Sequence, residues 1–173
     1  MQNFPWYTIA HPTDFLNQGD FILGCPILEQ IFNPQSEKIE AQYTEYDVII
    51  MSQSCDLENG KIQLVLVCPF EQLRIIAAQN PWFQSNKNLE KLRQGNQPNY
   101  HLLNQSTVAG HELDYIIVDF RTVFSVPFEF LTQKIKHTPS RLRLLPPYKE
   151  HLSQAFARFF MRVGLPVNIP LFK

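Results

Sequence analysis

Asp47-Val48-Ile49-Ile50-Met51 and Ile62-Gln63-Leu64-Val65-Leu66-Val67-Cys68 are two short runs rich in Val, Ile and Leu. Apolar runs of this length are typical of strands that are buried on both faces of a sheet. The segment between them, Ser52 to Lys61, contains the turn pair Asn59-Gly60. We therefore expect two central strands joined by a short connection.

Three further segments extend this β pattern. Asn17-Gln18-Gly19-Asp20 has the composition of a turn and precedes a predicted first strand, Phe21 to Leu28. Proline cannot donate a hydrogen bond to a sheet ladder, so we expect this strand to end or bulge near Pro26. Residues 33–38 are predicted to be a loop or hairpin tip, and Tyr115 to Phe120 a late strand.

Residues 79–112 have a different composition, in which Asn, Gln, Ser, Pro and Gly dominate. The only helical pattern in this segment covers Asn88 to Arg93 and stops at Gly95. Tyr100 to Leu103 has the character of an edge strand. We expect an insertion with one short helix.

The segment 147–164 is predicted to hold a C-terminal helix that runs from about Tyr148 to Val163. Its apolar residues recur at helical spacing, which predicts that one side of the helix packs on the core. Pro146-Pro147 suits the start of the helix, and Gly164 suits its C-cap. The apolar stripe comprises Leu152, Ala155, Phe156, Phe159, Phe160 and Val163.

The composition favours one domain, 1–173, in the cytoplasm. A chain of 173 residues that is 45% hydrophobic can bury its own core. No apolar run is long enough for a membrane span, and the N-terminus lacks the pattern of a secretory signal. Three cysteines at wide spacing predict neither a disulfide framework nor a paired zinc site. We expect no cofactor and no metal.

Charge is distributed unevenly along the chain. Residues 1–133 hold 7 Lys/Arg against 15 Asp/Glu, a net charge of −8. Residues 134–173 hold 8 Lys/Arg and one acidic residue, Glu150, a net charge of +7. The basic segment can pack on the acidic body of the same chain, with Asp47 and Asp56 among its partners, or it can present a surface to RNA or to an acidic protein.

Several segments, taken in order, resemble the PemK/MazF-like family of small SH3-like β-barrels. The similarity is carried by Gln18-Gly19-Asp20-Phe21-Ile22, Val48-Ile49-Ile50-Met51-Ser52, Asn59-Gly60, Leu64-Val65-Leu66-Val67-Cys68-Pro69, Tyr115 to Val123 and the terminal helix. The resemblance implies a mixed, mainly β fold, either an SH3-like barrel or a strongly bent sheet, in a bacterial regulatory, toxin-antitoxin or defence system.

The residues that the family uses for ribonuclease catalysis are not matched. Tyr46-Asp47 stands where the family has its catalytic Arg, and Phe70-Glu71 follows Pro69 where the family has Thr or Ser. An aspartate cannot stabilise the negative charge that develops in phosphoryl transfer. We therefore expect a non-catalytic or altered-site relative.

A second hypothesis is a hydrolase or transferase with Cys55 as its nucleophile. Ser52-Gln53-Ser54-Cys55-Asp56 follows a predicted buried strand, a frequent position for a nucleophile. His111, beside Glu112 and Asp114, is the favoured histidine. The structural alternative is that Ser52, Ser54 and Asp56 bind nearby backbone while Cys55 fills the core.

The binding hypothesis depends on the basic C-terminal segment. Arginine and lysine side chains contact phosphates, and the affinity then depends on salt. The partner is RNA or an acidic protein, not a membrane, and the sequence leaves a homodimer open. The candidate contacts are Arg141, Arg143, Lys149, Arg158 and Arg162.

Overall fold

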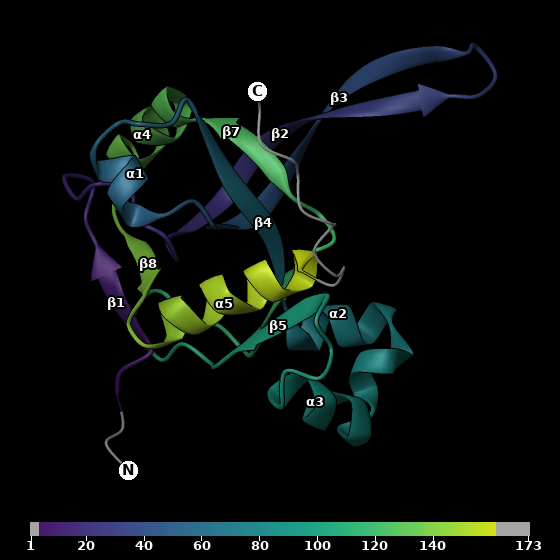
Figure 1. Cartoon of the computed structure of the whole chain (residues 1–173), viewed down its shortest axis with the longest axis vertical. Coiled ribbons are helices and arrows are strands. Elements are labelled where there is room, and N and C mark those ends of the chain that lie inside the picture. Colours follow the sequence, from purple (N-terminus) through teal and green to yellow (C-terminus); the bar gives the residue numbers. More distant parts are fainter. Residues whose placement is uncertain (1–3, 162–173) are drawn as a thin grey trace, which may run out of the picture.

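The computed structural model describes residues 4–161 and is mixed and mainly β (Figure 1). Its main sheet is six-stranded and antiparallel, in the order β2-β3-β4-β6-β5, with β7 also paired to β4. Over the described residues this sheet is not closed into a barrel. The strands are β2 (Phe21–Asn33), β3 (Lys38–Ile50), β4 (Leu64–Gln72), β5 (Tyr100–Leu103), β6 (Ile116–Asp119) and β7 (Phe124–Pro127).

The long strand β4 organises the sheet. It pairs with β3 where Val48 meets Pro69 and Ile50 meets Val67. The two runs that the sequence marks as central are therefore neighbours in the sheet, and Val48 is fully buried, as is Val67. Unlike the other strands, β4 pairs with three partners, since β7 and β6 follow one another along it.

A second, two-stranded sheet pairs a strand near the N-terminus with the strand that precedes α5. It consists of β1 (Tyr7–Ala10) and β8 (Arg141–Leu144), paired antiparallel. The Leu144 backbone N donates to the Gly19 carbonyl at 2.9 Å, which ties this sheet to the start of β2. Gly19 has φ +82°, and a Cβ there would lie 2.9 Å from the Leu144 Cβ, so the turn requires glycine.

The helical elements either accompany the two sheets or belong to the segment that follows β4. Three of the elements, α2, η1 and α3, follow β4 and bury a small apolar cluster around Phe83 and Leu92. None of the helices in the described range is long and apolar enough to cross a membrane. The helical elements are α1 (Ser54–Glu58), α2 (Leu73–Gln79), η1 (Pro81–Gln84), α3 (Asn86–Arg93), α4 (Phe128–Lys136) and α5 (Tyr148–Phe160).

The C-terminal helix is confirmed as α5, which begins at Tyr148 as expected. Leu152 is fully buried in the core that includes Phe21 and Phe120. Phe160 is 59% exposed, so the buried part of the stripe ends before it. Val163, Arg162 and Gly164 lie outside the described residues.

Other sequence expectations need correction. Of the two alternatives expected near Pro26, the strand does not end there but shifts register just before it, between Ile22 and Cys25, and β2 continues beyond Leu28 to Asn33. The hairpin tip at 33–38 is confirmed. Strands β1 and β8 and helix α4 lie in segments that carried no strand or helix prediction.

Candidate functional site

The turn after β3 is held by its serines. The Ser52 Oγ accepts a hydrogen bond from the Leu66 backbone N at 2.8 Å. Ser54 begins α1, and its Oγ accepts from the Gln18 backbone N at 3.3 Å and donates to the Asn17 Oδ1. Both serines thus fix backbone around this turn, and neither is hydrogen-bonded to a histidine.

Cys55 does not fill the core, as the structural alternative expected, but is exposed. Its Sγ lies 3.8 Å from the Gln53 Oε1 and 3.8 Å from the Asp56 Oδ1. Neither neighbour supplies the positive charge that stabilises a thiolate. Cys25 and Cys68 are buried, and burial raises the pKa of both thiols, that of Cys68 to about 12.

His111 lies in a different place from Cys55. Its Nε2 is 2.8 Å from the Ser140 Oγ, and the ring lines a cavity of about 220 Å³ together with Lys134 and Leu142. Within residues 4–161 no histidine forms a hydrogen bond with Cys55. The structure therefore does not assemble a cysteine–histidine pair from the predicted residues.

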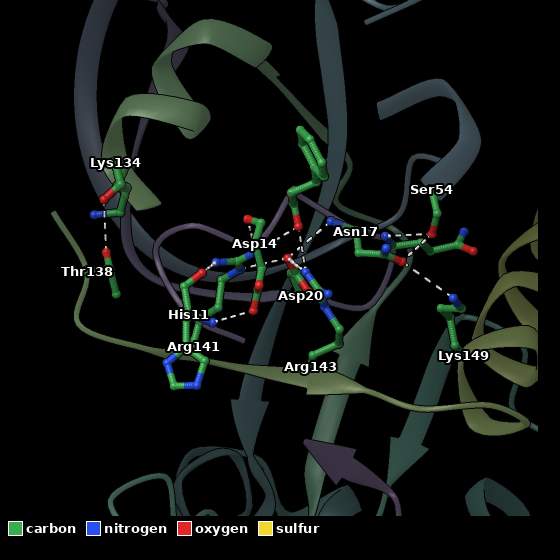
Figure 2. A network of polar contacts seen from close by, with 12 residues as sticks. His11, Asp14, Asn17, Asp20, Ser54, Lys134, Thr138, Arg141, Arg143 and Lys149 are labelled. Carbon is green, nitrogen blue, oxygen red and sulfur yellow. Dashed lines mark hydrogen bonds and ion pairs between the residues drawn. The ribbon is translucent and has the colours of Figure 1, made fainter. Parts of the chain in front are cut away.

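The most extensive polar network of the described chain surrounds Asp20 (Figure 2). Its carboxylate is fully buried and accepts from the Arg141 Nε at 2.7 Å and from the Arg143 Nε at 2.5 Å. Oδ2 also accepts from the Arg143 NH2 at 2.9 Å and from the Asn17 backbone N at 3.1 Å. A buried carboxylate with this many charged donors is fully compensated.

The same two arginines hold the loop that precedes β2. The Arg141 guanidinium donates to the carbonyls of His11, Asp14 and Phe15 at 2.8, 2.9 and 2.8 Å. The Arg143 NH2 donates to the Phe15 carbonyl at 2.6 Å. Residues 11–16 are therefore held against β8 by arginine side chains, whereas Gly19 and Asp20 also have backbone contacts with β8.

These contacts give the two arginines a structural role. Only 3% of the Arg141 side chain is exposed, so it cannot reach a phosphate, and this corrects its expected role in binding. The basic segment does pack on the acidic body, but through Asp20 rather than through Asp47 or Asp56. Asp47 instead accepts a hydrogen bond from the Gly24 backbone N at 2.8 Å.

Lys149 also contacts the loop before β2. Its Nζ lies 3.4 Å from the Asn17 Oδ1, the atom that accepts from Ser54. On the same side of α5, Ser153 Oγ accepts from the Gln18 Nε2 at 3.5 Å. This side of the helix is therefore engaged within the molecule.

The opposite side of α5 borders an open groove of about 360 Å³, called the α5 groove below. The helix contributes residues at a spacing of three and four positions, which places them on one side. The end of α3 and strand β5 form the other wall. The groove is lined by residues including Arg93, Gln94, Tyr100, His101, His151, Gln154 and Arg158.

The groove combines positive charge with an aromatic ring. Arg158 is exposed and has no ion pair within the described chain. Arg93 is paired with Glu90 at 2.7 Å, and the Arg121 Cζ lies 4.7 Å from the centroid of the Tyr100 ring. Arg121 does not line the groove, whereas Arg158, Arg93 and Tyr100 do, and cations beside an aromatic ring suit a ligand bearing phosphates and bases.

His101 also lines the groove and is neutral at neutral pH. Its ring stacks on Phe120 with a centroid distance of 6.0 Å. Burial, with a smaller contribution from nearby His151, lowers the pKa of His101 to about 4. The ring therefore adds no positive charge to the groove at neutral pH.

Arg158 was a binding candidate from the sequence, whereas the residues that line the groove with it were not. Arg93 and Tyr100 fall in the predicted insertion, and nothing local indicates that this segment faces α5. In the sequence these residues appear only as a predicted edge strand that follows a short basic helix. That pattern does not indicate which other part of the chain they face. Arg162 lies beyond the described residues.

No group of three or more His, Cys, Asp or Glu residues that could hold a metal ion occurs in the described range 4–161. A comparison with protein-family models found no match, and comparisons with curated proteins and with solved structures found none either.

Proposed function

We propose that this chain is a non-catalytic or altered-site PemK-like domain that binds single-stranded RNA in the α5 groove. The observation that carries the proposal is the position of Arg158, an unpaired, exposed cation on the wall opposite Tyr100. Phosphates would lie against Arg158 and Arg93, and a base would stack on the aromatic wall.

The alternatives receive less support. For a Cys55 enzyme, no histidine and no cation among the described residues is hydrogen-bonded to the thiol, which contacts Gln53 and Asp56 instead. Binding through the whole basic segment is less well supported, because Arg141 and Arg143 are paired with the buried Asp20 carboxylate. An acidic protein would use the same groove cations but would offer no bases to stack on Tyr100.

The proposal is tested by titrating labelled single-stranded RNA at two salt concentrations. Affinity should fall with salt, at about −0.7 in log-log slope for each phosphate neutralised. Arg158→Ala should weaken binding and flatten the slope by about that amount. Arg74→Ala is the matched control, since Arg74 is exposed but does not line the groove.

The outcomes separate the hypotheses. Equal losses in the Arg158 and Arg74 variants would indicate a diffuse charge effect without a groove. Absence of RNA binding by the unaltered protein at low salt contradicts the proposal. Cys55→Ser should bind RNA as the unaltered protein does.

A further inference from the structure

Strands β2 and β3 extend beyond the rest of the sheet as a two-stranded hairpin (Figure 1). β3 pairs with β4 only from Val48 to Ile50. Within the described residues 4–161, residues 28–43, called the arm below, therefore pair only with each other. A two-stranded hairpin is marginally stable by itself in water, so the arm lacks the support that a packing partner would give.

The register sorts the arm residues onto two faces. Residues opposite one another share a face, and the next pair along lies on the other face. One face carries the pairs Leu28–Tyr43, Gln30–Ala41 and Phe32–Ile39. The other carries Glu29–Gln42, Ile31–Glu40 and Asn33–Lys38.

The first face has no charge, and its large side chains are exposed. Leu28 is 54% exposed, Phe32 61%, Ile39 68% and Tyr43 74%. This apolar face is not a continuation of the core, because the core residues Cys25 and Ile27 at the base of the hairpin belong to the other face. An exposed apolar patch of this kind marks a contact surface.

We infer that the apolar face of the arm packs against the same face of a second copy of this chain. A twofold contact requires a self-complementary surface. The uncharged face meets this requirement, because a twofold axis at the central Gln30–Ala41 pair brings Leu28–Tyr43 of one copy onto Phe32–Ile39 of the other. Ala41 is small and permits close approach there.

The area is consistent with a dimer of low affinity. At roughly 200 Å² for each large apolar residue, the four exposed side chains present on the order of 500 Å² per copy. Two copies would bury about 1,000 Å² in total, the lower limit for a specific interface. The dimer should therefore form at high protein concentration and dissociate on dilution.

Charge favours this arrangement over others. The charged strand residues of the arm, Glu29, Glu40 and Lys38, lie on the face that points away from the contact. Glu45, which pairs with Pro26, lies on the same face as Leu28 and Tyr43, and the twofold brings it near the hairpin tip of the other copy, which holds Glu37. Salt screens the repulsion between these carboxylates. Salt should therefore strengthen the dimer. A basic partner protein would instead be released by salt.

Sedimentation equilibrium across a range of protein concentrations, at low and at high salt, tests the inference. The unaltered protein should dimerise, more strongly at high salt. Phe32→Thr combined with Tyr43→Thr should weaken the dimer by at least about tenfold. Ile31→Thr is the matched control on the opposite face and should leave the dimer unchanged. Circular dichroism verifies that both variants are folded.

A cross-link adds a second measurement in a Cys55→Ser background. Gln30→Cys places two thiols at the proposed axis and should give a covalent dimer on mild oxidation, whereas Glu29→Cys, on the other face, should not. A monomer at every concentration would overturn the inference. So would a dimer that Phe32→Thr with Tyr43→Thr leaves intact. Neither result bears on RNA binding, which is measured separately.

Discussion

The Asp20 carboxylate and the Arg141 guanidinium lie 2.7 Å apart, although 121 residues separate them in the chain. Both side chains are closed off from solvent, with 0% and 3% of their surface exposed. The pair connects the start of β2 to β8 and fixes the loop between β1 and β2. It therefore joins segments that no local interaction would bring together.

This pair gives the first prediction. Asp20→Asn should lower the free energy of unfolding by about 3 to 5 kcal/mol, because it leaves two guanidinium groups without a counter-charge. Urea denaturation measures the change. Arg158→Ala, an exposed substitution, should stay within about 0.5 kcal/mol of the unaltered protein. A similar loss of unfolding free energy in both variants would show that the Asp20 network stabilises the fold no more than an exposed side chain does.

The second prediction concerns the packing of α5. Leu152 is fully buried in the larger core, so Leu152→Ala should cost about 2 to 5 kcal/mol. Gln154, exposed on the same helix, is the control, and Gln154→Ala should be close to neutral. Thermal and urea unfolding of both variants check this. If Leu152→Ala left the free energy of unfolding unchanged, the helix would not be part of the core.

The third prediction is a pH dependence from His101. Burial lowers its pKa to about 4, below the ordinary value near 6.5, so the unfolded chain binds a proton between these values and the folded chain does not. Stability should therefore fall as the pH drops from about 6.5 to 4, by on the order of 2 kcal/mol. His101→Gln should lose less stability over this range. His11→Gln, at an exposed position, should behave as the unaltered protein does.

The fourth prediction concerns the thiols. Cys55 is exposed, whereas Cys25 and Cys68 are buried and their pKa values are raised. A neutral-pH thiol reagent should label one cysteine in the folded protein and three after denaturation. Cys55→Ser should abolish labelling of the folded protein. Two or more labelled cysteines in the native state would contradict the burial of the other thiols.

Local pattern was enough for several parts of the fold. The runs at residues 47–51 and 62–68 predicted the central pair of strands. The expectation that both are buried on both faces was wrong for the second run, since Leu64 is 54% and Leu66 42% exposed. The spacing of Leu152 and its neighbours predicted α5, because a helix repeats every 3.6 residues. Residues 33–38 predicted the hairpin tip.

Short segments with charged residues were missed. β8 consists of Arg141-Leu142-Arg143-Leu144, in which the charged residues are turned toward Asp20 and the leucines toward the core. The sequence shows the alternation of arginine and leucine. It does not show the buried Asp20 carboxylate, whose negative charge compensates the two arginines. For the same reason Arg141 and Arg143 resembled surface contacts for RNA.

The sequence by itself determined the central strands, the terminal helix and the unequal distribution of charge, because these depend on periodicity and composition along the chain. Only the tertiary structure decided which cations are available. It buried Arg141 against Asp20, placed Arg158 opposite Tyr100 and separated His111 from Cys55. The physical reason is that burial and charge pairing depend on partners far apart in sequence, which come together only when the sheets and α5 pack.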